Sequence, residues 1–180
     1  MPSWLWIVIG VACAGAVATA VVAAITAWNN AVRKYLERLL GRREEARAVR
    51  RAFDELIAQV RSSDAEKAAF ADDPEALERH SVDELRDRAR QLAEELNTIA
   101  LPKKLVTAAE TLADACDILA EEAGRVGDEL IADEALEALE AIDLTRVDAA
   151  YAHADAEFAT VCASCGVEDS ASYAGGLYFG

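Results

Sequence analysis

Apolar side chains recur at alternating steps of three and four residues between Val32 and Val60, which is the spacing of one face of an α-helix. Eight of the nine sites are apolar, and the exception is Arg42. A seam that keeps this period for four heptads predicts a coiled coil or a long bundle helix. We expect Val49, Phe53 and Leu56 to lie on the contact seam of this helical stalk. The full set of sites is Val32, Tyr35, Leu39, Arg42, Ala46, Val49, Phe53, Leu56 and Val60.

Helical periodicity continues through the rest of the chain, interrupted by short polar segments that carry helix-start signals. Capping boxes pair Ser63 with Glu66, Ser81 with Glu84 and Thr145 with Asp148, and Asp73-Pro74 supplies an N-cap followed by proline. Two short helices are expected within 63–80. Longer helices are expected over 81–97, 102–126, 128–142 and 145–163. No segment alternates with period two for long enough to predict a strand, so the predicted fold class is all-α, with an antiparallel helical bundle.

An uncharged run of 25 residues, from Trp4 to Trp28, precedes this region. As a helix it is about 37 Å long, which is enough to cross a hydrocarbon core of roughly 30 Å. Trp4 and Trp6 lie at one end and Trp28 at the other, and aromatic side chains favour the membrane interface. A cleaved signal peptide is the alternative, but the run has no basic segment before it and is unusually long for one. We therefore expect a single N-terminal transmembrane helix that continues into the stalk.

The net charge of −15 is divided unevenly along the chain. Residues 33–51 hold eight basic and three acidic side chains, whereas residues 52–180 hold ten basic and thirty acidic ones. Because basic residues follow the uncharged run and none precedes it, the positive-inside rule predicts a single-pass protein of the cell membrane, with its N-terminus outside and its C-terminal domain cytoplasmic. The expected partners include anionic inner-leaflet lipids but not nucleic acid. The predicted headgroup contacts are Arg33, Lys34, Arg38, Arg42 and Arg43.

Small residues recur at steps of four within the uncharged run, a spacing that lets two membrane helices pack closely. This pattern predicts a homo-oligomer or association with a partner in a membrane complex. The alternative is chance, because the whole chain is rich in alanine. The sites concerned are Gly10, Ala14, Ala18, Gly15, Thr19 and Ala23.

The predicted organisation has four parts. A transmembrane anchor (1–30) leads into a basic helical stalk (31–61), an acidic helical bundle (62–165) and a flexible C-terminal tail (166–180). The tail is rich in Gly, Ser and Ala and lacks periodicity, which favours a loose segment. Its aromatic residues Tyr173, Tyr178 and Phe179 offer the alternative of a short docking motif.

Cys162 and Cys165 form the one motif with candidate chemistry, a C-x-x-C pair. Such a pair can provide half of a zinc site or a redox couple. The remaining ligand candidates are Cys116, His80 and His153, none with ligand spacing to the pair. Because Cys116 and Cys165 fall on predicted helix seams, packing of thiols in the core is the favoured interpretation over metal binding or redox chemistry.

The chain lacks the phosphate-binding loop, the nucleophile elbow and the H-E-x-x-H pair that would point to common enzyme classes. We therefore expect no catalytic residue and no cofactor. The function predicted from sequence is a membrane-anchored helical scaffold whose bundle self-associates or docks a partner, and an accessory subunit of a membrane complex shares the same features. The alternative is a metal- or thiol-redox-responsive membrane protein that uses the C-x-x-C pair.

Overall fold

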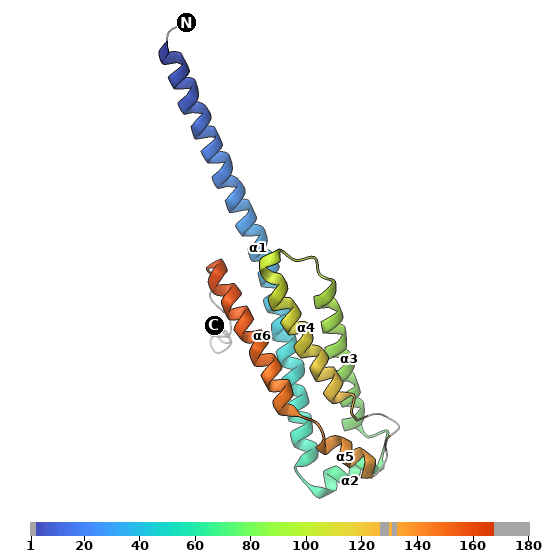
Figure 1. The fold of residues 1–180 in the computed structure, drawn as a ribbon. Coiled ribbons are helices and arrows are strands. Elements are labelled where there is room, and N and C mark those ends of the chain that lie inside the picture. Colours follow the sequence, from blue (N-terminus) through green and yellow to red (C-terminus); the bar gives the residue numbers. More distant parts are fainter. Residues whose placement is uncertain (1–2, 127–129, 131–132, 168–180) are drawn as a thin grey trace, which may run out of the picture.

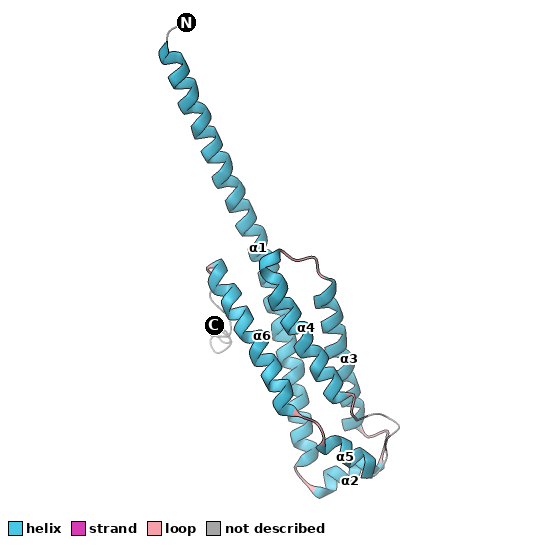
Figure 2. Ribbon diagram, viewed as in Figure 1, coloured by secondary structure: helices cyan, strands magenta, loops and turns pink. Residues whose placement is uncertain are grey.

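The computed structural model describes residues 3–126, 130 and 133–167. Within the first helix it describes the side chains of residues 19, 21–23, 26–28 and 30 onward. All regular structure in these ranges is helical, which confirms the predicted all-α class (Figure 2). The predicted docking residues of the C-terminal tail, Tyr173, Tyr178 and Phe179, lie outside the described residues. The helices are α1 (Ser3–Arg61), α2 (Asp64–Asp72), α3 (Leu77–Thr98), α4 (Lys103–Ala123), α5 (Asp133–Glu140) and α6 (Leu144–Cys165).

Four long helices form an up-down-up-down bundle: the C-terminal half of α1, then α3, α4 and α6 (Figure 1). Consecutive long helices are antiparallel, and α3 packs against α4, which in turn packs against α6. The short helices α2 and α5 lie together at one end of the bundle. At the opposite end the N-terminal half of α1 projects away from the other helices (Figure 1). The predicted antiparallel bundle is therefore confirmed.

The helix boundaries follow from local capping. The Ser63 hydroxyl accepts a hydrogen bond from the Glu66 N–H at 3.1 Å, so the first of the three predicted capping boxes is present, at the start of α2. The other two predicted capping boxes do not begin a helix in the structure. Ser81 lies inside α3 and its hydroxyl donates to the Leu77 carbonyl at 2.8 Å, a bond typical of serine within a helix. The N-cap of α6 is Asp143, which accepts from the Arg146 N–H at 3.1 Å, not Thr145.

The face of α1 that enters the core differs from the predicted seam at three sites. Leu36, Arg43 and Ile57 are buried, whereas their neighbours Tyr35, Arg42 and Leu56 are only partly buried. One residue corresponds to a rotation of about 100° around a helix. The difference arises because α1 contacts α3, α4 and α6 together and buries a broader face than a two-helix seam would. The remaining predicted sites are buried as expected: Val32, Leu39, Ala46, Val49, Phe53 and Val60.

The segment predicted as a separate stalk, 31–61, is thus one of the four long helices of the bundle. Phe53 and Ile57 are fully buried by other helices of the same chain. The sequence seam therefore serves packing within one molecule. Alanines in α4, such as Ala108, Ala115 and Ala123, are buried as well and leave little space between the helix backbones.

A membrane span requires a helix with about 20 consecutive, predominantly apolar residues. Over the part of the chain that the structure describes, no helix meets the combined requirement of length and apolar character. The predicted transmembrane helix is therefore not supported. The predicted localisation as a single-pass protein of the cell membrane is contradicted by the same finding.

Candidate interaction surfaces

The N-terminal half of α1 extends beyond the bundle as a continuous helix (Figure 1). Its described side chains, from Thr19 to Ala31, are all exposed. Three of them are large and apolar: Val21 is 51% exposed, Val22 62% and Trp28 61%. We call this part of the helix, residues 3–31, the α1 arm.

The residues predicted from sequence as interface anchors and packing sites all fall on the α1 arm. Trp28 is exposed near the point where the arm leaves the bundle. Thr19 and Ala23 are exposed on the same helix. Outside the described side chains lie Trp4, Trp6, Gly10, Ala14, Gly15 and Ala18.

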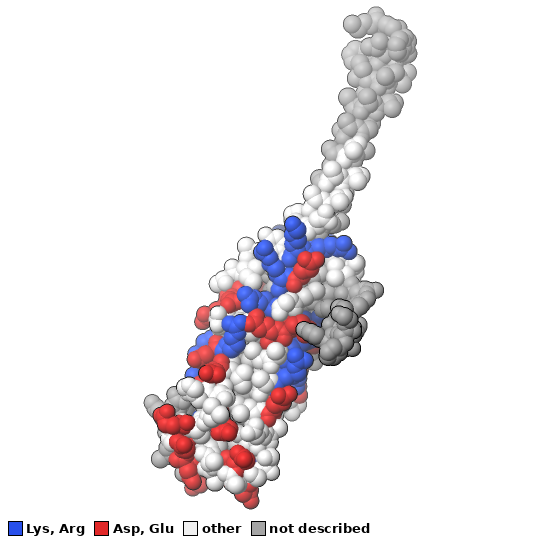
Figure 3. Space-filling model, turned by 180° about the vertical axis from the view of Figure 1, so that it is seen from behind, with Lys and Arg blue, Asp and Glu red and all other residues white. Residues whose placement is uncertain are grey.

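Basic side chains gather where the arm meets the bundle (Figure 3). Arg33, Lys34 and Arg38 of α1 are exposed there, and Lys103 and Lys104 in the first turn of α4 are exposed too. Arg33 and Lys104 line the same cleft between α1, α4 and the C-terminal end of α6. Arg33 also donates a hydrogen bond to the Gly166 carbonyl at 3.3 Å. We call these five residues the basic collar.

Two of the five predicted headgroup contacts are instead engaged within the bundle. Arg43 is 1% exposed; its Nε donates to Asp155 at 2.8 Å and its guanidinium lies 5.2 Å from the centre of the Phe158 ring. Arg42 forms ion pairs with Glu45 at 2.8 Å and with Glu95 at 2.7 Å. These two arginines hold α1 against α6 and α3, so the predicted role in contacting a ligand outside the chain does not fit their positions.

Further arginines complete a row of ion pairs between α1 and α6. Arg47 contacts the second oxygen of Asp155 at 2.8 Å, so one carboxylate binds both Arg43 and Arg47. One turn further along, Arg50 pairs with Asp148 and with Asp54. Several basic side chains of residues 33–51 therefore form ion pairs that hold α1 against α6.

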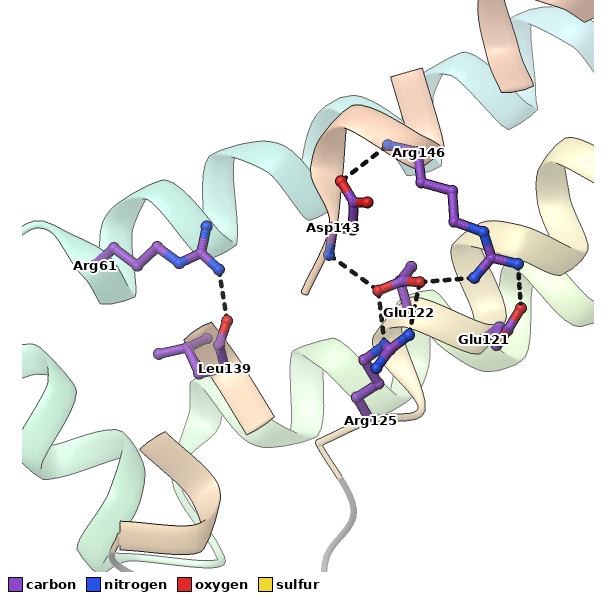
Figure 4. A network of polar contacts seen from close by, with 7 residues as sticks. All are labelled: Arg61, Glu121, Glu122, Arg125, Leu139, Asp143 and Arg146. Carbon is purple, nitrogen blue, oxygen red and sulfur yellow. Dashed lines mark hydrogen bonds and ion pairs between the residues drawn. The ribbon is translucent and has the colours of Figure 1, made fainter. Parts of the chain in front are cut away.

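A buried carboxylate connects α4 to the start of α6 (Figure 4). Glu122 is 0% exposed, and it accepts from the Asp143 N–H at 3.0 Å, from Arg125 at 2.7 Å and from Arg146 at 2.9 Å. Arg146 extends the network to Glu121 at 2.8 Å. The same figure shows Arg61 at the end of α1, whose guanidinium donates to the carbonyl of Leu139 in α5.

The protonation of Glu122 reflects two opposing effects. Burial raises the pKa of this carboxyl, but the Asp143 N–H and the two guanidinium groups outweigh burial and hold the pKa below its ordinary value. The group is therefore an anion at neutral pH. Sequence reasoning missed it, although Glu122 continues a seven-residue step from the buried Ala108 and Ala115, which could have signalled an inward position.

Two of the three cysteines whose side chains the structure describes are in the core. Cys116 and Cys162 are buried, and Cys165 is partly buried at the end of α6. The Cys116 sulfur lies 3.7 Å from the Tyr151 hydroxyl, and burial raises the pKa of Cys116 to about 11. Across the described residues, no three His, Cys, Asp or Glu side chains are placed to hold a metal ion.

Comparison of the chain with protein-family models, curated protein sequences and solved structures found no match.

Proposed function

We propose that this chain is a non-enzymatic helical scaffold whose bundle presents the α1 arm for association with the arm of a second copy. The observation that carries this proposal is the continuity of α1. One helix of 59 residues forms a wall of the bundle with its C-terminal half and projects from it with its N-terminal half.

Anchoring in the bundle fixes the direction of the arm. The bundle half of α1 buries an apolar face that includes Leu36, Leu39 and Phe53. It is also tied to α6 by the Arg43–Asp155 ion pair at 2.8 Å. A helix held by both apolar packing and ion pairs transmits its orientation to the next turns, so the arm is positioned before any partner binds.

The chemistry of the arm favours association. Residues 4–28 contain no charged side chain, and Val21, Val22 and Trp28 are largely exposed. Helices that are apolar around their whole circumference are normally buried, because covering apolar surface contributes about 25 cal/mol per Å². In a pair of copies related by a two-fold axis, each arm would provide the same surface to the other. The small residues spaced by four along the arm suit close approach of two such helices.

Self-association is tested by measuring the mass of the full chain in solution by light scattering. We expect a dimer or a higher oligomer whose dissociation is promoted by Val22→Glu, because the substitution places a charge on the arm. The matched control is Ala58→Glu, which adds the same charge at an exposed site on the bundle half of α1. A wild-type chain that is monomeric in solution contradicts the proposal. An oligomer whose mass is unaffected by Val22→Glu contradicts it as well.

A further inference from the structure

Two adjoining hollows run along the bundle half of α1 close to the basic collar. The first, of about 170 Å³, is lined by Ala31, Lys34, Tyr35 and Arg38. The second, of about 450 Å³, shares Tyr35 and Arg38 and extends to Glu45, with Ile99 and Leu101 from the α3–α4 connection on its other side. Together they form one continuous depression from Ala31 to Glu45, which we call the collar groove.

A glycine within a helix, Gly41, is one of the residues that line the collar groove. A Cβ atom added at Gly41 would meet nothing within 4 Å, so packing within the described chain does not require glycine there. Glycine also destabilises a helix interior relative to alanine. Ile99 on the opposite side is 37% exposed. The hollow at Gly41 therefore has the space and the apolar surroundings to receive a side chain.

One side of the groove is basic. Lys34, Arg38 and Arg42 follow one another at steps of four and so share a helix face. Arg42 is neutralised by Glu45 and Glu95. No ion pair with a described carboxylate joins Lys34 or Arg38. The end of the groove next to the collar therefore carries positive charge, which favours an acidic occupant with apolar side chains.

We propose that the collar groove is the docking site for residues 168–180 of the same chain. This segment begins with Glu168 and Asp169, contains no Lys or Arg, and carries Leu177, Tyr178 and Phe179 toward its other end. Its charge is thus opposite to that of Lys34 and Arg38, and its apolar residues match the hollow at Gly41.

The distances allow this connection. Gly166 accepts the Arg33 hydrogen bond, so the described chain ends against α1 at the basic collar, in the cleft that Arg33 and Cys165 line. From Arg33 to Gly41 the helix rises about 12 Å, and a helix with its side chains is about 10–12 Å across. Thirteen extended residues reach about 43 Å, which is ample for a path around α1. A segment tethered this closely has an effective concentration in the millimolar range, so few contacts are needed to hold it.

The test places a photo-activated cross-linker in the full chain, as p-benzoylphenylalanine in place of the aromatic Tyr35, which lines both hollows and leaves the space at Gly41 free. After irradiation, the cross-linked peptides are identified by mass spectrometry. We expect links between the probe and residues 168–180. When isotopically labelled and unlabelled chains are mixed, each link should join two segments of the same chain. The control carries the probe at Gln59, which is exposed on the same helix but outside the groove, and should not link to this segment.

Charge reversal provides a second measurement. Arg38 is exposed, so Arg38→Glu leaves the core intact, and it should lower the cross-link yield about threefold to fivefold. Combining it with Glu168→Lys and Asp169→Lys should recover the yield. Links to any segment other than 168–180, links between different chains, or a yield indifferent to Arg38→Glu would overturn the proposal. Because this readout is internal to one molecule, it is independent of whether the α1 arm self-associates.

Discussion

Arg43 of α1 and Asp155 of α6 are joined by a 2.8 Å contact between Nε and Oδ1, although 112 positions separate them in the sequence. The arginine is buried and stacks on Phe158, whereas the Asp155 side chain is 35% exposed. The pair is therefore asymmetric: loss of the carboxylate leaves a buried cation, and loss of the arginine leaves a carboxylate that water can reach.

This asymmetry predicts that Asp155→Ala destabilises the fold more than Arg43→Met. We expect Asp155→Ala to lower the free energy of unfolding by about 2 kcal/mol, because the buried Arg43 and the neighbouring Arg47 both lose this carboxylate. Arg43→Met keeps the packing on Phe158 and should cost about 1 kcal/mol or less. Urea unfolding followed by circular dichroism measures both, with the exposed Arg51→Met as a control. Equal costs for the two variants would contradict the predicted asymmetry.

The Glu122 network predicts a loss of stability in acid. The folded-state pKa of Glu122 lies below its ordinary value of 4.5, so the stabilisation is fully present above that pH and is lost as the pH falls through the folded-state pKa. Glu122→Gln should lower the free energy of unfolding by about 2 kcal/mol at pH 7. The difference between wild type and variant should shrink below about pH 4.5. Denaturant unfolding at several pH values measures it, and a difference constant between pH 7 and pH 3 would refute the assignment.

The position of Phe53 predicts that its truncation affects the fold rather than the association of copies. Phe53 is fully buried by helices of its own chain. We expect Phe53→Ala to lower the free energy of unfolding by about 3–5 kcal/mol through loss of burial and formation of a cavity. Leu56→Ala, at a partly buried site, should cost less. If Phe53→Ala left stability unchanged but reduced the oligomer mass, the seam would pair between copies instead.

Thiol reactivity should differ among the described cysteines. Cys165 is partly exposed, whereas Cys162 is buried and Cys116 is buried with a pKa of about 11. An alkylating reagent at pH 8 should therefore modify Cys165 first, because the thiolate is the reactive form and must be reached by the reagent. Peptide mapping by mass spectrometry follows each site. Modification of Cys116 at the rate of Cys165 in the native protein would show that α4 and α6 open readily.

The sequence predicted the elements better than it predicted their contacts. The 3.6-residue period, the Ser63 cap and the position of Pro102 were sufficient for the all-α class, the start of α2 and the end of α3 before Pro102. Of the two short helices expected within 63–80 only α2 is present, because Asp73 ends that helix and does not begin another. The buried face of α1 differs from the predicted seam by one residue at Leu36, Arg43 and Ile57. Periodicity does not specify how many other helices a helix packs against. The predicted helix start at Ser81 is wrong, because a serine hydroxyl can donate a hydrogen bond to a carbonyl within its own helix as well as cap a helix.

The candidate surfaces were predicted less well, because residue type does not reveal the partner. The sequence does not distinguish Arg42 and Arg43 from Arg33 and Lys34, yet distant carboxylates of α3 and α6 bind the first two. In the sequence Glu122 is one of many acidic residues. Only the fold brings its three hydrogen-bond donors together around it. The single-pass membrane prediction rested on the uncharged run, the tryptophans at its ends and the basic residues that follow it, and the helices described in the structure contradict it.

The up-down order of the bundle also has a consequence for biosynthesis. The buried face of α1 is translated first, but its ion-pair partners Asp148 and Asp155 are translated about a hundred residues later. At a synthesis rate of roughly 5–20 residues per second, Arg43 and Arg50 wait about 5–20 s for the carboxylates of α6. During that interval α3 and α4 can already cover part of the apolar face of α1, and the part that packs on α6 stays uncovered. The last helix to be made therefore completes the protection of the first one.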